Sequence, residues 1–586
     1  MRLSVTSRSL NNVIAYLIPG FFAGLVFFHL PHAAAGYRVI KWSCAGFLLF
    51  FVAALLYQRL ESLRLPSSKI LLLSAAAFPL SRAFSLFANG TDIAISMVGV
   101  SRWIIGLAFA LLTGAIWASL DQKQKENTLL CLLIIAALAS IPLVNSFSDM
   151  FHKGYIFEPA ISGTFGNPNW AAGYFITVLP VAVYLLFTSP EHSKKLIVGL
   201  ALLLVVCGIG ASLSKTGIYA GIVILIMSFL TFYRRRTLIK YTVCFGILIL
   251  VFGVIYFHDE VFLWLQPRLF IWKALLINMS DSWLIGNGAL QSLRTIESGL
   301  VRVIGGNSSS YMPSMQVDFV HNDYLQAFVE GGILGFTTFL TMVILTLRKA
   351  YQSGSRISHT AGLSFLALSI FALGDSPLQV PVTFYVWWFL AAVIWYDDIS
   401  TEGLVVTNTR AVKVFLLTAM VLFLAEGTRN CLGSYYWTQS GKTTTLLKQK
   451  QCLKKACLFI VENGDVHTEY AQALDRSRQY REARSQALRA RAVKFDYADL
   501  YLIAECDIAL KVTDSLSAWQ SIADKFPCLN YPKLQLAKFY LENRQYQLAR
   551  EQCSQVINSC QSVHTNQPYN DQALRIMEMI DKLPQK

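Results

Sequence analysis

The sequence predicts an all-α protein, in which a polytopic transmembrane helical bundle of about 12 to 13 spans precedes a helical-repeat domain. Of its 586 residues 54% are hydrophobic, and the mean hydropathy of +0.47 is too high for an ordinary soluble protein. Apolar runs of about 18 residues, each able to cross a bilayer as a helix, recur from Val13 to about Leu424. Beyond that point the hydropathy falls, and alanines recur at a fixed spacing.

The apolar runs assign residues 1 to 430 to the transmembrane domain. The first run follows two arginines, as a signal peptide would, but it is longer than a typical signal sequence and another run follows at once. We therefore assign it as the first transmembrane helix. The expected spans lie near 13 to 30, 42 to 57, 70 to 87, 103 to 120, 129 to 144, 170 to 187, 196 to 213, 217 to 232, 241 to 257, 324 to 347, 361 to 373, 381 to 395 and 412 to 424.

The basic residues of the short loops are divided unevenly between alternate loops. The set that begins with the N-terminus holds Arg2, Arg8, Arg59, Arg64, Lys69, Lys123, Lys125, Lys194, Lys195, Arg234, Arg235, Arg236, Lys240, Arg348, Lys349, Arg356, Arg410 and Lys413. The opposite set holds only Arg38, Lys41, Arg102, Lys153 and Lys215. The positive-inside rule then predicts a cytoplasmic N-terminus and, after thirteen spans, an extracytoplasmic C-terminal domain. The net charge of +15 thus reflects topology, and we expect no nucleic-acid partner.

The same topology places a large loop, residues 258 to 323, on the outer side. Its stretch from Phe262 to Leu284 is rich in aromatic residues and predicts an amphipathic helix lying on the bilayer.

Residues 440 to 586 carry a periodic pattern of small residues. Ala471, Ala504 and Ala537 are 33 residues apart. Small residues where paired helices touch, at a period near 34, resemble degenerate tetratricopeptide repeats. The alternative is a helical bundle without repeats. Further alanines follow in the expected second helices, at Ala483, Ala518 and Ala549.

The segment from Asp318 to Gly335 is the most informative for function. Asn322 or Asp323 is expected to cap the tenth span, with Gln326 completing a capping box and the paired glycines allowing close helix approach. This structural account explains neither His321 at the membrane boundary nor Glu330 about two turns into an apolar helix. Ionisable groups at such depths are functional candidates.

Three further segments carry candidate residues. Asn167 and Asn169 belong to a Gly-Asn-Pro-Asn turn that is expected to cap the sixth span. Lys215 lies in a tight hairpin, Ser212 to Gly217, as either an interface anchor or a phosphate ligand. Arg268 lies in the aromatic stretch, where the structural alternative is a side chain that reaches up to the lipid headgroups.

Together these segments resemble the O-antigen ligase superfamily, which includes O-antigen ligases, some Wzy-type glycan polymerases and bacterial O-linked protein oligosaccharyltransferases. The resemblance covers about residues 160 to 395, and the order of its motifs makes it specific although each motif is weak. The C-terminal repeats look like a domain appended to some members. The motifs are Gly-Thr-Phe-Gly-Asn-Pro-Asn, Leu-Ser-Lys, Pro-Arg-x-x-x-Trp, Leu284-Ile-Gly-Asn-Gly288 and His-Asn-Asp-Tyr-Leu-Gln-x-x-x-Glu-x-Gly-x-x-Gly.

The resemblance implies a metal-independent, inverting transfer of a glycan from undecaprenyl diphosphate to an acceptor hydroxyl, on the outer face of a bacterial cytoplasmic membrane. It gives His321 the role of general base, and Lys215 and Arg268 the role of diphosphate ligands. Lys215 stands where the family often has arginine, so a point charge replaces a bidentate group. No cofactor is expected. The supporting residues are Asn322, Asp323, Glu330, Asn167 and Asn169.

Several functions remain open from the sequence. The acceptor is a lipid, a protein or a growing glycan, so a ligase or an oligosaccharyltransferase competes with a polymerase. The repeats are expected to offer a surface to a protein partner. A lipid-linked glycan flippase or transporter is the alternative from another class. Most spans lack the midplane ionisable residues typical of transporters, Arg82 and Glu330 being the exceptions.

Overall fold

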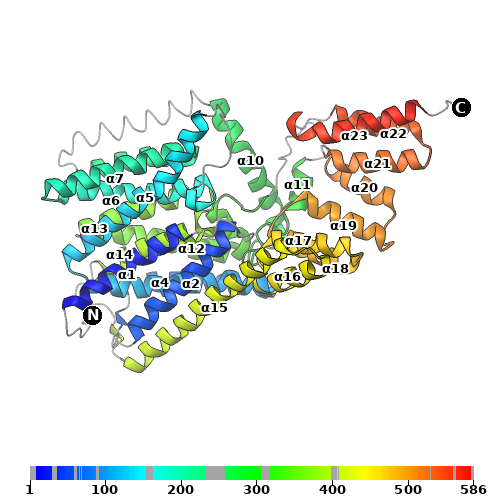
Figure 1. Cartoon of the computed structure of the whole chain (residues 1–586). Helices are drawn as coiled ribbons and strands as arrows, with labels where there is room; N and C mark the ends of the chain where they lie inside the picture. Colours follow the sequence, from blue (N-terminus) through cyan, green and yellow to red (C-terminus); the bar gives the residue numbers. More distant parts are fainter. Residues whose placement is uncertain are drawn as a thin grey trace. The chain divides into compact units, whose positions relative to one another are not determined.

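The structure is a computed structural model (Figure 1). It describes residues 8–28, 36–57, 63–64, 66, 69–87, 92–152, 163–232, 258–304, 317–397, 405–406, 408–527, 529–558 and 563–582. The described chain is helical apart from one short antiparallel pairing of β1 (Leu63–Arg64) with β2 (Val405–Val406) and one isolated bridge. Its contacts divide it into two compact units.

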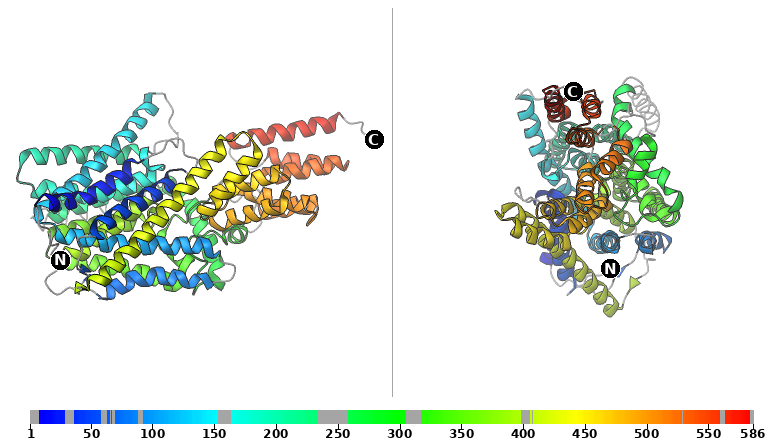
Figure 2. Two further views of the ribbon diagram at one scale, coloured as in Figure 1. Left: turned by 60° about the horizontal axis from the view of Figure 1, so that its bottom comes forward. Right: turned by 90° about the vertical axis from the view of Figure 1, so that its right-hand side faces the viewer.

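The first unit comprises Met1–Leu263, Trp283–Ala289 and Val320–Thr438. Its helices lie side by side in a bundle (Figures 1 and 2). They are α1 (Arg8–Phe27), α2 (Gly36–Tyr57), α3 (Lys69–Phe84), η1 (Ser85–Phe87), α4 (Ile93–Ser119), α5 (Gln122–His152), η2 (Gly163–Phe165), α6 (Pro168–Thr188), α7 (His192–Ala211), α8 (Lys215–Phe232), α12 (Asp323–Gln352), α13 (Arg356–Phe371), η4 (Pro377–Gln379), α14 (Pro381–Tyr396) and most of α15 (Thr409–Lys442).

Eight of the described helices are long and apolar enough to cross a membrane, and the protein is a multi-pass membrane protein. Three shorter apolar helices, Ala15–Phe27, Ile70–Phe84 and Pro381–Tyr396, accompany them. Each expected span coincides with a helix except 241 to 257, which lies outside the described residues. The eight helices are α2, α4 to α8, α12 and α15.

Helix α14 lies at the centre of the first unit, since all its residues are buried. Its tryptophans pack against α4, with the rings of Trp103 and Trp388 6.0 Å apart. A Cβ on Gly106 of α4 would lie 2.1 Å from Trp388 Nε1, so only glycine admits the indole there. This aromatic core fixes the start of α14 and the segment before it, which carries part of the candidate site.

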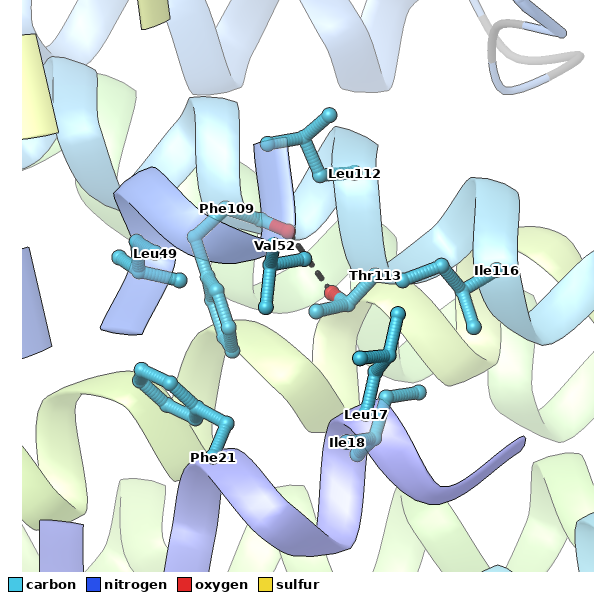
Figure 3. A pocket seen from close by; sticks show the side chains of 9 residues that line it. All are labelled: Leu17, Ile18, Phe21, Leu49, Val52, Phe109, Leu112, Thr113 and Ile116. Atoms are coloured by element: carbon cyan, nitrogen blue, oxygen red, sulfur yellow. Dashed lines mark hydrogen bonds between the residues drawn. The ribbon is translucent and has the colours of Figure 1, made fainter. Parts of the chain in front are cut away.

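A small cavity between α1, α2 and α4 has a volume of about 10 Å³ and is lined almost entirely by apolar side chains (Figure 3). The hydroxyl of Thr113, its one polar lining group, donates to the carbonyl of Phe109 at 2.8 Å. With its polar group satisfied, the cavity offers nothing to a polar substrate and is a packing defect.

The second unit comprises Trp264–Ser282, Leu290–Phe319 and Gln439–Lys586, so it joins parts of the predicted outer loop to the C-terminal helices. Apolar residues are spread around α10 rather than gathered on one side, and the prediction of an amphipathic helix here is wrong. The unit contains most of α10 (His258–Ile277), η3 (Asn278–Asp281), α11 (Ile296–Ile304), α16 (Leu446–Phe459), α17 (Gly464–Arg476), α18 (Tyr480–Val493), α19 (Tyr497–Ala509), α20 (Ser515–Lys525), α21 (Asn530–Glu542), α22 (Tyr546–Ile557) and α23 (Val563–Asp581).

The C-terminal helices are short and paired in sequence order (Figure 2). The alanines of the 33-residue pattern lie in α17, α19 and α21 and are all buried, as expected for contacts between paired helices. These three helices also end alike. The residues with positive φ, Arg478, Lys511 and Arg544, are 33 positions apart, and after each the next amide donates to a carbonyl five residues back.

Candidate functional site

The candidate site begins at the N-terminus of α12. Asn322 is the N-cap, and its side-chain oxygen accepts a hydrogen bond from the amide of Leu325 at 2.9 Å. His321, directly before the cap, has a φ of 55°, a conformation that non-glycine residues rarely adopt. This conformation alone does not show a function, since Arg478, Lys511 and Arg544 adopt it at ordinary helix ends.

His321 faces a carboxylate from another element. Its Nδ1 lies 3.5 Å from Oδ1 of Asp375, in the loop between α13 and α14. Asp375 is buried and His321 is 32% exposed, so the imidazole lies between a buried acid and the surface. The amide of Ser376 donates to Asp375 Oδ1 at 2.7 Å and orients the carboxylate. This arrangement suits a base, because a carboxylate at Nδ1 stabilises the imidazolium that forms when Nε2 takes up a proton.

The loop that carries Asp375 is fastened to the start of α12 through Asp323. The amide of Asp323 donates to the carbonyl of Ala372 at 2.9 Å. Its carboxylate accepts from the amide of Leu378 at 3.0 Å and from Gln379 Nε2 at 3.4 Å. Asp323 therefore supports the geometry of the His321–Asp375 pair rather than capping α12.

Two further motifs lie at the same end of the bundle. Asn167 caps α6, as expected, by accepting from the amide of Asn169 at 2.8 Å. The side-chain oxygen of Asn169 in turn accepts from Ser214 Oγ at 2.6 Å, which ties α6 to the hairpin before α8. Lys215 is the first residue of α8 and is exposed. The N-termini of α6 and α8 are thus joined by one hydrogen bond.

The hairpin also lies near the loop of Asp375, since a Cβ placed on Gly374 would lie 3.7 Å from Thr216 Cγ2. The motifs of Asn169, Lys215, His321 and Asp375 are therefore close together within the first unit. They include the N-termini of three helices, each of which carries partial positive charge from its unpaired amides.

Glu330 lies deeper in α12 and is completely buried. It forms an ion pair with Arg82 of α3 and accepts a hydrogen bond from Gln326 Nε2 at 2.6 Å. The Gln326 side chain therefore donates to Glu330 and not to the start of α12, and the prediction that it completes a capping box is wrong. A paired and hydrogen-bonded carboxylate is the form in which a charge is tolerated at this depth.

The helix α12 is broken directly after Glu330. Gly332 has φ 63° and ψ −161°, and a Cβ on it would lie 2.2 Å from the carbonyl oxygen of Leu284. The segment Trp283–Ala289 fills the break, since its amides at Asn287 and Gly288 donate to the carbonyls of Val329 and Glu330 at 2.8 and 3.2 Å. The glycine pair thus admits a loop, where close packing of two helices was expected.

Arg268 is described with the second unit. It lies on α10 and is 8% exposed. The other sequence-predicted residues, Lys215, His321, Asn322, Asp323, Glu330, Asn167 and Asn169, belong to the first unit.

The sequence reasoning missed Asp375 and treated Arg82 only as an exception among the spans. Asp375 lies in the sequence Gly-Asp-Ser-Pro between two apolar runs. These residue types are typical of a turn, so they give Asp375 no sign of a role in a site. The one available indication was an acid in an otherwise apolar region, 54 residues after His321.

Residues 200–340 match the family described as O-antigen ligase. The match covers Lys215, Arg268, His321 and Glu330, and it leaves Asn169 and Asp375 outside. A search of curated proteins found no match.

Proposed function

We propose, from the O-antigen ligase domain at residues 200–340, that this protein transfers a glycan from undecaprenyl diphosphate to an acceptor hydroxyl on the outer face of a bacterial cytoplasmic membrane. A domain of this family indicates a membrane glycosyltransferase with a lipid-linked glycan substrate. The observation that carries the proposal is the pairing of His321 with the buried Asp375 inside a multi-pass bundle.

In this mechanism His321 removes the proton of the attacking hydroxyl while the diphosphate leaves. The new glycosidic bond forms as the bond between the anomeric carbon and the phosphate oxygen breaks. The proton passes to Nε2 of His321, and Asp375 stabilises the resulting imidazolium. Attack from the side opposite the leaving group inverts the anomeric carbon.

The leaving diphosphate gains negative charge as the bond breaks. The family resemblance gives Lys215 and Arg268 the role of supplying positive charge for it, and within the first unit the N-termini of α6, α8 and α12 offer backbone amides. Asn167, Asn169, Asn322 and Asp323 hold these groups in place. The ion pair of Glu330 with Arg82 joins α12 to α3. No metal enters the mechanism, which follows the family resemblance.

We further propose that the C-terminal helices form a tetratricopeptide-like solenoid on the extracytoplasmic side of the membrane. The buried alanines and the similar helix ends at 33-residue intervals support the repeat, and the loop charges support the orientation. Such a domain suits binding of a protein partner or an acceptor.

The test is transfer by the purified protein in lipid, supplied with a defined undecaprenyl-diphosphate glycan. We expect release of undecaprenyl diphosphate, product of inverted anomeric configuration, and activity that survives EDTA. Offering lipid, peptide and glycan acceptors separately distinguishes a ligase, an oligosaccharyltransferase and a polymerase. Movement of the intact lipid-linked glycan across the membrane without transfer would contradict the proposal and indicate a flippase.

A further inference from the structure

In the second unit the C-terminal helices hold the short helix α11 by charge. Glu297, in the first turn of α11, forms an ion pair with Arg491 at the end of α18. Its other carboxylate oxygen lies 3.5 Å from Lys525 Nζ at the end of α20. One carboxylate thus joins α11 to two C-terminal helices.

The ion pairs of Glu297 line a pocket of about 240 Å³, which has Ser517 and Ser521 on its wall. Packed side chains hold α11 as well, since Ile296 and Leu300 are each 1% exposed. Burial lowers the pKa of Arg491, and the charge of Asp499 acts in the opposite direction.

A second attachment holds the segment that follows α11. The amide of Val317 donates to the carbonyl of Phe495 at 2.8 Å, and the amide of Phe495 donates back to Val317 at 2.9 Å. Phe495 lies between α18 and α19, close in sequence to Arg491. The C-terminal helices therefore contact this part of the chain at α11 and again at Val317.

The other side of α11 is fixed to α10, the helix of Arg268. Asn278, directly after α10, donates through Nδ2 to the carbonyl of Thr295 at 2.6 Å and to Ser298 Oγ at 2.8 Å. A Cβ on Gly299 would lie 1.9 Å from the carbonyl oxygen of Ala274, so the backbones of the two helices touch. The contacts run without a gap from Arg491 and Lys525, through Glu297 and α11, to α10.

We propose that the C-terminal helices act as a clamp that positions Arg268 within the second unit, and that Glu297 is the positioning residue of this clamp. Arg491 and Lys525 hold Glu297, which sets α11 and, through it, the placement of Arg268 on α10. The inference rests on the proposed function, because it assigns Arg268 to the donor diphosphate.

The first test measures the clamp without any substrate. Glu297→Gln keeps the shape of the side chain and removes its charge, so amide hydrogen exchange of Ile296–Ile304 and of α10 should become faster. The double variant Glu297→Arg with Arg491→Glu should restore part of the protection, because it re-forms that pair with reversed charges but loses the pairing with Lys525. The matched control is Glu578→Gln, at an exposed position of α23. Unchanged exchange in α10 and α11 of Glu297→Gln would overturn the clamp, whatever the enzyme does.

The second test links the clamp to the donor. Glu297→Gln should raise the donor KM roughly tenfold with kcat nearly unchanged, and the charge-reversed pair should lower KM again. In an Arg268→Ala background the same substitution should have no further effect, since Arg268 is then absent. Independent, multiplying effects of the two substitutions would contradict a role through Arg268. Absence of transfer in the unaltered protein would instead contradict the proposed function and leave the exchange result standing.

Discussion

At the residue scale, the mechanism depends on one acid that the matched family region does not include. Asp375 is buried, is oriented by the amide of Ser376, and faces Nδ1 of His321. An imidazole alone accepts a proton at Nε2, but a fixed carboxylate behind it both selects the ring orientation and stabilises the charge that appears.

We therefore expect Asp375→Asn to lower kcat roughly 10²-fold while the donor KM stays near its normal value. The substitution keeps an oxygen acceptor for His321 and removes only the charge. Asp121→Asn, at an exposed position before α5, is the matched control. Normal kcat in Asp375→Asn would show that the carboxylate does not assist the base.

A second acid makes the stability of the C-terminal helices depend on pH. Asp499 in α19 is completely buried, and burial raises its pKa to about 6, although it accepts a hydrogen bond from Thr468 Oγ1 at 2.7 Å. The unfolded value is about 3.9. The folded state therefore binds the proton more tightly, and the stability from this group falls as pH rises from about 4 to about 6.

Asp499→Asn should remove that loss. We expect slower amide hydrogen exchange in α19 at pH 7.5, corresponding to roughly 2 kcal/mol of local stability, and little difference from the unaltered protein near pH 4. Equal exchange at pH 7.5 would show that Asp499 is neutral or fully compensated there.

At the element scale, the break in α12 decides where Glu330 lies. The loop Trp283–Ala289 takes the place of a helical turn and uses the carbonyls of Val329 and Glu330. Irregular backbone at membrane depth is tolerated only where other protein groups satisfy it, as they do here.

Gly332→Ala should destabilise the first unit by roughly 1 to 3 kcal/mol, because the added methyl group meets the carbonyl of Leu284 and φ is positive. Gly331→Ala is the control, since a Cβ there would lie 3.4 Å from Arg82 Cγ. Thermal unfolding of the two variants in detergent compares them directly. Equal melting temperatures would contradict the observed break.

The sequence was sufficient for features that depend on local pattern. Apolar run length located the helices of the bundle. Residue type placed the cap of α6 in the turn that contains Asn167 and limited the cap of α12 to Asn322 or Asp323, of which the structure shows Asn322. The partners of Glu330 and His321 could not be predicted from the sequence. Arg82 is 248 residues from Glu330, and Asp375 is 54 residues from His321. The loop that fills the break after Glu330 could not be predicted for the same reason. Gly331 and Gly332 of α12 are equally typical of two helices in close contact.

At the scale of the whole molecule, the account requires the candidate site and the C-terminal helices to lie outside the cytoplasm. A phosphatase fused after residue 440 should be active in cells, and one fused after Lys240 inactive, because the loop charges favour that orientation. Western blots of both fusions control for expression. The reverse activities would place His321 on the wrong side for an extracytoplasmic acceptor.

The most direct test of the central claim is the turnover of His321→Ala in the purified transfer assay, compared with His192→Ala at an exposed position of α7. If His321 is the base, its variant should fold, bind the lipid-diphosphate donor normally and lose roughly 10²-fold to 10⁴-fold in kcat. His192→Ala should keep normal activity. If His321 only helps to shape the start of α12, turnover should stay near normal, and that result would contradict the mechanism.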